Sequence, residues 1–183
     1  MVSLRNSAAR FEIPLTVIEG GSGSFTGVIT ETGQDSYRSN VFTEPRRVLR
    51  VRTPTIIRPG LVVRSPAGDV FIVGDNGNSE VPEGELWNSF KLFKATGQVA
   101  WFRRGVRNDP VTLLEVEGPP EDMGLIWATI EASSRETVER KLHLSLEEAT
   151  FIVGADVQRD DTLDGRPVIR SDELLGIRIG VLR

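Results

Sequence analysis

The stretch RPGLVVRSPAGDVFIVGDNG, Arg58–Gly77, decides the fold class. Two short apolar runs flank the tetrapeptide SPAG (65–68), in which proline stands second and glycine fourth, as in a β-turn. The runs are too short for helices and are joined by too few residues for anything but a direct reversal of the chain. The stretch therefore predicts a tight β-hairpin, with Leu61–Arg64 against Asp69–Val73.

Similar patterns continue on both sides of this hairpin. Apolar and polar residues alternate over 11–17 and again over 175–181, and LDGR (163–166) is a strong hairpin turn. About ten short strand candidates stand against two ambiguous segments, 85–94 and 133–149, for which helix and strand both remain open. We expect an all-β fold, a β-barrel or sandwich of short antiparallel strands with long loops, possibly two barrel-like units, and at most one or two short helices.

The chain has 183 residues, a length that suits one domain or two small ones. We expect residues 1–10 to form a flexible N-terminal arm. Gly118-Pro119-Pro120 is the best candidate for a break between halves. The predicted units are 11–117 and 118–183, packed together as one compact domain.

Composition excludes several classes of protein. The chain has no cysteine and one histidine, His143, which excludes disulfide scaffolds, thiol catalysis, iron–sulfur clusters and histidine-rich metal sites. No apolar run approaches the roughly 20 residues that span a bilayer, so we expect no membrane partner. The N-terminal residues lack the apolar segment of a secretory signal, and the composition suits assembly in a reducing cytoplasm.

Motifs for chemistry are also missing. The glycines between residues 20 and 27 do not form a phosphate-binding loop, and no nucleophile elbow is present. Residues 160–165 begin like a calcium-binding loop, but Ser171 stands where the closing glutamate should be. We therefore predict no catalytic residue, no metal and no cofactor. An enzyme that uses the carboxylates of Asp160, Asp161 and Asp164 is the least favoured alternative.

Charge is unevenly distributed along the chain. The net charge is −4, yet residues 38–64 hold seven arginines and one acid, whereas 109–173 hold 16 acids and six bases. Such segregation favours contacts between unlike faces of neighbouring copies, although solvated strand faces would give the same pattern. The predicted interface residues are Arg46, Arg47, Arg50, Arg52 and Arg64 on the basic side and Asp160, Asp161 and Asp164 on the acidic side.

The segment Arg58–Gly77 resembles the head-closure (stopper) and head–tail joining proteins of tailed bacteriophages. In that family a β-barrel carries a stretch of the form G-D-x-V … G-x-x-Y-x-V. The matching places are held here by Gly60, Val62, Gly68, Phe71 and Val73. A second, fainter match covers 155–182, and the two together span about half the chain. The chain departs from the pattern in its length and at the tyrosine, which is Phe71 in the first match and Pro167 in the second.

The resemblance implies a non-enzymatic virion protein of the phage neck. Such proteins form a ring of six or twelve copies, seal the packaged head and dock the tail. The expected partners are further copies of the chain, the portal or adaptor, and tail proteins, with packaged DNA passing through the channel without sequence-specific contact. The expected location is the head–tail junction of the virion, after assembly in the host cytoplasm.

Other functions remain open beside this one. A tail terminator or a capsid decoration protein would share most of these features. The arginine-rich segment 46–64 would also suit a β-barrel that binds nucleic acid or another ligand.

Overall fold

The computed structural model describes residues 11–31, 47–52, 55, 57–75, 87–112, 114–132 and 148–183. Over these residues the protein is all-β, with twelve strands and no α-helix. The strands are β1 (Ile13–Glu19), β2 (Ser24–Glu31), β3 (Arg47–Arg52), β4 (Val62–Arg64), β5 (Val70–Gly74), β6 (Trp87–Lys94), β7 (Gly97–Asn108), β8 (Glu115–Ala132), β9 (Ala149–Val153), β10 (Thr162–Leu163), β11 (Arg166–Leu174) and β12 (Ile177–Leu182).

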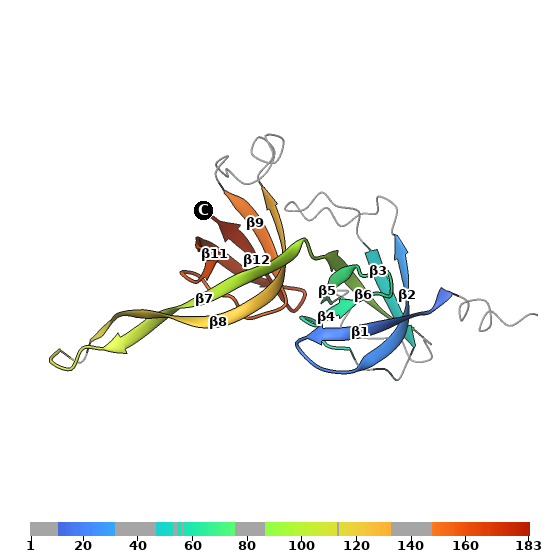
Figure 1. Ribbon diagram of the computed structural model, residues 1–183, viewed down its shortest axis with the longest axis horizontal. Helices are drawn as coiled ribbons and strands as arrows, with labels where there is room; N and C mark the ends of the chain where they lie inside the picture. Colours follow the sequence, from blue (N-terminus) through green and yellow to red (C-terminus); the bar gives the residue numbers. More distant parts are fainter. Residues whose placement is uncertain are drawn as a thin grey trace, which may run out of the picture.

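The strands form two closed six-stranded antiparallel barrels, one after the other in the chain (Figure 1). Around the first barrel the order is β1-β2-β3-β6-β5-β4, and around the second it is β7-β8-β9-β12-β11-β10. The two orders are identical when β1 is matched with β7. The protein is therefore a tandem repeat of one topology, in which β4 closes on β1 and β10 closes on β7.

The repeat extends to individual hydrogen bonds. In the first barrel the Gly60 amide donates to the Val73 carbonyl, and the Val73 amide donates to the Leu61 carbonyl. In the second barrel Asp160, Val168 and Asp161 make the same pair of bonds. Both Gly60 and Asp160 have a positive φ, at 87° and 71°. The hairpins within the two sequence matches thus lie at equivalent places in the two barrels, although Phe71 corresponds to Arg166 and not to Pro167.

Each barrel has its own apolar core, and a third cluster joins them. Leu15, Leu49, Val51 and Phe71 are among the buried residues of the first core, and Trp101, Phe151, Leu163 and Val168 are among those of the second. The third cluster contains Val62, Val70, Ile72, Ala95, Ile152, Ile177 and Ile179. These buried residues come from β4, β5, β9, β12 and the β6–β7 connection, and the partly buried Ile18, Phe93 and Trp127 of β1, β6 and β8 pack against them.

Backbone contacts make this junction tight. A Cβ atom at Gly154 would overlap the carbonyl oxygen of Gly60, so glycine at 154 allows these two backbone segments, one from each barrel, to approach each other. The Asp75 amide donates to the Leu175 carbonyl at 2.8 Å, and the Thr129 hydroxyl donates to the Lys94 carbonyl at 2.7 Å. The barrels are therefore held by hydrogen bonds as well as by apolar packing.

Both predicted hairpins are confirmed. Val62, Val63 and Arg64 pair with Ile72, Phe71 and Val70, and the Gly68 amide closes the turn on the Ser65 carbonyl. In the second hairpin Leu163 pairs with Arg166, and both turn residues have positive φ, as a two-residue turn of this type requires. The ambiguous segment 85–94 is a strand from residue 87 onward.

The predicted boundary at 117–118 is misplaced. The chain passes from one barrel to the next between β6 and β7, whereas Gly118-Pro119-Pro120 lies inside β8. The proline pair did not break the strand because it occupies a bulge, where ladder hydrogen bonds are already absent. The predicted flexible N-terminal segment 1–10, Arg46 and the segment 133–147 lie outside the described residues.

Candidate assembly interface

A long hairpin projects from the second barrel. Strand β7 pairs with β10 only at Trp101 and Phe102, and β8 pairs with β9 only from Ala128 onward. From Arg103 outward the two strands pair with each other alone, forming a ribbon that leaves the barrel on the side away from the first one (Figure 1). Six residues of extended chain carry it about 20 Å beyond the barrel. We call residues 103–121 the arm.

The arm is narrow and bulged near its base. Gly105 lies opposite Gly118, and Pro119 and Pro120 on β8 face a single residue of β7. A Cβ atom at Gly105 would overlap the carbonyl oxygen of Pro119. A bulge of this kind increases the local twist and redirects the strand, so these residues set the direction of the arm.

The tip of the arm is an ordered turn with exposed apolar side chains. The Asp109 carboxylate accepts hydrogen bonds from the amides of Val111 at 2.7 Å and Thr112 at 3.0 Å. These backbone bonds lower the pKa of Asp109 below its ordinary value. Val111 is 88% exposed and Leu114 66% exposed. The described residues of the tip therefore present apolar groups to solvent beside a hydrogen-bonded turn.

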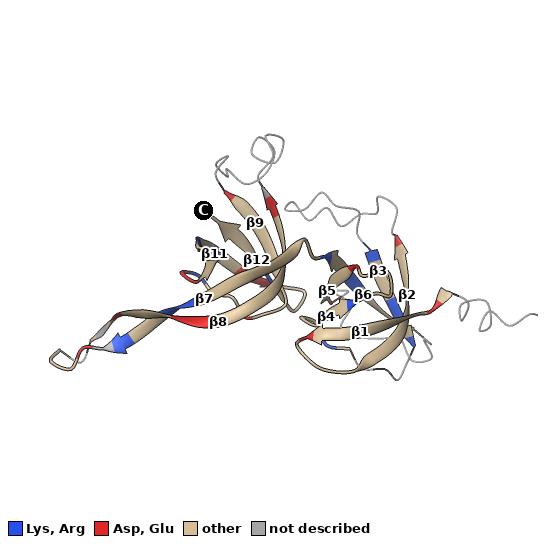
Figure 2. Ribbon diagram, viewed as in Figure 1, with Lys and Arg blue, Asp and Glu red and all other residues tan. Residues whose placement is uncertain are grey.

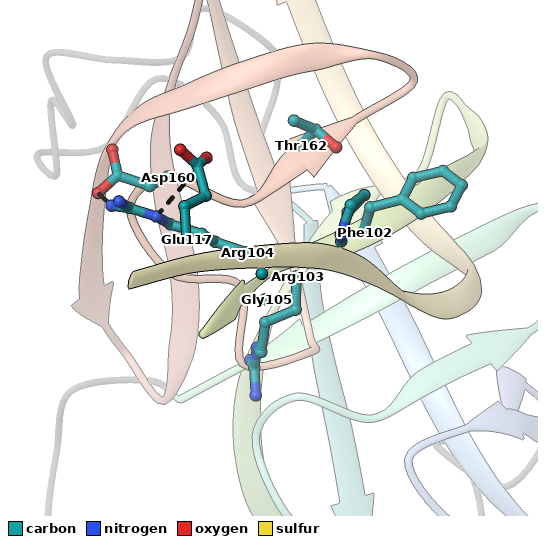
Figure 3. Close-up of a pocket in the computed structure, with 9 residues that line it drawn as sticks. Phe102, Arg103, Arg104, Gly105, Glu117, Asp160 and Thr162 are labelled. Atoms are coloured by element: carbon teal, nitrogen blue, oxygen red, sulfur yellow. Dashed lines mark hydrogen bonds and ion pairs between the residues drawn. The ribbon is translucent and has the colours of Figure 1, made fainter. Parts of the chain in front are cut away.

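Ion pairs fasten the base of the arm to the barrel. Arg104 lies 3.4 Å from Asp160 and 4.0 Å from Glu117, and the three side chains point toward one another in Figure 3. They line a pocket of about 430 Å³ with Arg103, Phe102, Thr162, Gly105, Gly118 and Pro120. The charged groups of this pocket are neutralised by one another, and we assign it no ligand.

Asp161 is the buried anchor beneath the arm. It is only 2% exposed, and its carboxylate accepts hydrogen bonds from Trp101 Nε1 and from the Gln158 amide, each at 2.9 Å. The Arg104 amide donates to its second oxygen at 3.3 Å, and Arg103 Nε lies 3.7 Å from the first. One carboxylate thus connects the Trp101–Arg104 part of β7 to the loop before β10.

A second carboxylate, Asp156, holds the outer side of the same junction. Arg178 donates to it through Nε at 3.0 Å, and Arg103 lies 4.0 Å away. Burial acts to raise the pKa of Asp156, but hydrogen bonds from Gln158 and Arg178 and the arginine charges outweigh it and lower the pKa. The carboxylate is therefore held in its charged form.

The structure separates the predicted basic residues. Arg50 and Arg52 alternate with the buried Leu49 and Val51, so they point outward from β3. Arg64 is on β4, three strands away in either direction around the barrel. The four predicted arginines that the structure describes therefore do not form one patch.

The environments of these arginines also differ. Arg47 lies over the Phe71 ring and pairs with Glu31 at 3.2 Å. Arg52 pairs with Glu12 at 2.6 Å and lies over the Trp87 ring. Arg50 and Arg64 are exposed and form no ion pair with any residue that the structure describes. Arg50 is thus the basic group of β3 that is open to a partner.

The three predicted acidic residues do not form one open surface, because each has a partner within the second barrel. Asp161 as a surface contact is wrong, because the Trp101 indole and neighbouring amides enclose it. Asp160 is exposed but pairs with Arg104. Asp164 is exposed on the β10–β11 turn, where its carboxylate accepts the Ala100 amide at 2.7 Å.

Sequence reasoning missed the arm itself. The exposed acids on β8 and the arginines on β7 are visible along it in Figure 2. The sequence signal is the length of alternating chain around 97–132, with a turn near Asp109-Pro110 in its middle. Because Gly118-Pro119-Pro120 favours a break, the sequence predicts that the two halves of this hairpin belong to different units.

Comparisons with known proteins identify no relative of this chain, so the function is inferred from its sequence and structure. No protein-family model, curated protein or solved structure matches the chain. Over the described residues no helix is long and apolar enough to cross a membrane. The same residues contain no group of three or more potential ligands placed to hold a metal ion.

Proposed function

We propose that the protein is a non-enzymatic structural subunit of a homo-oligomeric ring, and that the ring belongs to the neck of a tailed bacteriophage. In this role it closes the filled head and offers a surface to the tail. The observation that carries the assembly part of the proposal is the arm, a two-stranded ribbon with apolar side chains at its tip.

A ribbon of this kind is better suited to contact than to isolation. Two strands without a covering layer are marginally stable in water, and exposed apolar groups gain free energy when a partner covers them. The base of the arm is nevertheless fixed by Asp161, Asp156 and Arg104. The fold thus holds the arm in one direction before any partner is present, which reduces the entropy lost on docking.

The phage part of the proposal is supported by the family resemblance and by the repeat. The stretch that resembles the stopper proteins is the β4–β5 hairpin, and the fainter match includes its counterpart, β10–β11. Two tandem barrels would account for a chain longer than the usual single barrel of that family.

Immunogold electron microscopy of phage particles from the source host, with antibody against this chain, tests the proposal directly. We expect gold at the head–tail junction. Gold on the capsid or along the tail would move the protein to a decoration or terminator role. Particles that carry no label, in preparations where a portal antibody labels normally, would contradict the virion role.

A second candidate is a nucleic-acid-binding barrel, favoured by one observation. Arg50 and Arg52 lie on the outward face of β3, and the Arg52 guanidinium lies 5.2 Å from the Trp87 ring centre. Basic groups beside an aromatic ring suit single-stranded nucleic acid. Retention on single-stranded DNA that falls with salt would support this function, and no retention at low salt would remove it.

A further inference from the structure

We propose that the arm of one copy docks on the outward face of β2 and β3 of the next copy, so that the ring is assembled head to tail. This inference rests on the proposed ring and names the two surfaces that join. The occupant of the β2–β3 face is a second copy of this chain, contacting it through Val106, Val111, Leu114 and Glu117.

The arm offers apolar and acidic groups together. Val106 and Glu117 are directly opposite each other across the ribbon, so their side chains share one face. The Glu117 side chain is 75% exposed, and its ion pair with Arg104 is long, at 4.0 Å. Val111 and Leu114 extend the apolar part to the tip. A complementary surface must therefore be apolar with a basic group.

The β2–β3 face has that composition. Phe25, Ile29, Leu49 and Val51 belong to the core, so the alternate residues Val28, Val48 and Arg50 point outward. Val28 pairs with Arg50 across the two strands. Both valines are partly exposed, and the Arg50 guanidinium has no ion pair among the described residues. Glu117 of an incoming arm would supply the missing charge.

The two surfaces lie at opposite ends of the protein. No residue of β2 or β3 contributes to the cluster between the barrels, because β3 is diametrically opposite β4 in the first barrel. The arm leaves the second barrel on the far side from the first (Figures 1 and 2). Two different surfaces at opposite ends give a heterologous contact, which closes into a ring when the rotation between copies allows it.

Chemical cross-linking tests which surfaces meet. The chain has no cysteine, so introduced thiols are the only ones present. We would combine Leu114→Cys and Val48→Cys in one chain and treat it with a short bismaleimide. The control chain carries Leu114→Cys with Arg64→Cys, an exposed site on the opposite side of the same barrel. We expect a ladder of covalent multimers from the first chain, at a yield about tenfold above the control, because docking raises the local thiol concentration.

Single-cysteine chains separate this contact from a symmetric one. Leu114→Cys mixed with Val48→Cys should give covalent dimers that contain one of each. Efficient dimers from Leu114→Cys alone would indicate that arms meet arms, and would overturn the proposal. Equal yields from the 114–48 and 114–64 chains would also overturn it.

Charge reversal tests the pairing of Glu117 with Arg50. Glu117→Arg or Arg50→Glu alone should lower the multimer yield about fivefold, as expected for a charge pair at the rim of an interface. Both changes in one chain should restore it. A mixture of the two single variants should also recover multimers, because the reversed arm of one variant fits the reversed face of the other and the two unchanged surfaces fit each other, so that the variants alternate along the array. No recovery in that mixture, or none in the double variant, would contradict the pairing.

These outcomes are distinct from failure of the proposed neck function. A 114–48 ladder without gold at the head–tail junction would leave the docking mode in place and remove the virion role. Gold at the junction with no 114–48 product from isolated virion rings would retain the role and overturn this docking mode.

Discussion

The two barrels share a strand order, and two of their differences concern the arm: the length of one hairpin and the residue at one equivalent position. The β1–β2 hairpin of the first barrel ends at a short glycine-rich loop, whereas its counterpart β7–β8 continues outward as the arm. Leu61 in the first barrel has Asp161 as its counterpart in the second. The comparison shows how a repeated framework gains a new surface, because one strand pair is extended and a carboxylate fixes its base.

A polar residue such as Asp161 is suited to the base of the arm, where the orientation of two strands has to be fixed. Apolar packing is non-directional, whereas a carboxylate with several donors fixes orientation. Asp161 accepts bonds from Trp101, Gln158 and Arg104, which come from both sides of the junction. The first barrel has no arm to orient, and a leucine suffices there.

Replacing the anchor by its counterpart should give the largest effect. Asp161→Leu leaves the Trp101 indole N–H and two backbone amides without their acceptor, and Arg103 keeps only Asp156, at 4.0 Å, as a counter-charge. We expect the free energy of unfolding to fall by about 3–5 kcal/mol, as for the loss of one partner in a buried polar network. Denaturant titration monitored by tryptophan fluorescence measures it.

Asp161→Asn is the matched control. It keeps one acceptor oxygen and the side-chain volume, so about half of the loss should be recovered. If Asp161→Leu were as stable as the parent, the carboxylate would not be the anchor, and the difference between the barrels would have another cause.

The narrow base of the arm should give the next largest effect. Gly105→Val places a branched side chain against the Pro119 carbonyl. We expect a loss of about 2–3 kcal/mol, confined to the arm, because overfilling forces the paired strands apart. Hydrogen exchange of residues 103–121 reports the arm, and exchange of β9 and β12 reports the barrel.

Gly97→Ala serves as control for this glycine. Nothing lies within 4 Å of a Cβ atom at residue 97, which begins β7 without a positive φ. Its exchange pattern should match the parent. Equal protection of the arm in Gly105→Val would show that the two strands do not need their close approach.

The fold class could be predicted because its determinants are local. The turns at 65–68 and 163–166 carry their own residue preferences, and the buried runs Val62–Val63 and Val70–Val73 are adjacent to one of them. Barrel closure was not predictable in the same way. Pro14 suggests an edge strand, yet β1 is paired on both sides. The proline is tolerated because pairing with β4 starts only at Thr16, beyond it.

The candidate site was less predictable, because it depends on what encloses each charge. Asp160 and Asp161 are neighbours of the same type, but one is exposed and the other is buried under Trp101. Arg50 and Arg64 are close in sequence and on opposite sides of a barrel. Charge segregation along a chain is therefore a poor guide to patches when each strand crosses the sheet in turn.

Gly60 and Asp160 occupy equivalent positions of the two barrels, and both have a positive φ. Gly60→Asp copies the second barrel into the first, but a Cβ there would lie 3.0 Å from the Gly154 carbonyl oxygen at φ +87°. We expect a loss of about 2 kcal/mol, from backbone strain and contact with the other barrel. Thermal unfolding measures it.

The reverse change, Asp160→Gly, should alter stability by less than about 0.5 kcal/mol. Relief of strain at φ +71° offsets the greater freedom of glycine in the unfolded chain. If Gly60→Asp and Asp160→Gly lost the same stability, the contact of residue 60 with the other barrel would not be the cause of the difference between the two positions.

The smallest expected effect concerns the junction between the barrels. Burial raises the pKa of Glu19 above its ordinary value, and the hydrogen bond that the Trp127 amide donates to it at 3.0 Å only partly counteracts this. The folded protein then binds this proton more tightly than the unfolded chain does. The free energy of unfolding should therefore fall as the pH rises from the ordinary glutamate pKa to the raised one. Glu19→Gln, which keeps an acceptor for Trp127, should remove that slope and slightly increase stability at neutral pH.

Glu19→Ala distinguishes the charge from the hydrogen bond. It should also lose the slope, but with lower stability at every pH, because the Trp127 amide is left without its acceptor. Urea titrations between pH 4 and pH 7 compare the three proteins at one-unit steps, a range that covers the usual scatter of glutamate pKa values on the raised side. If Glu19→Gln kept the parent's slope, the titrating group would lie elsewhere, and the junction would not contribute to the pH dependence.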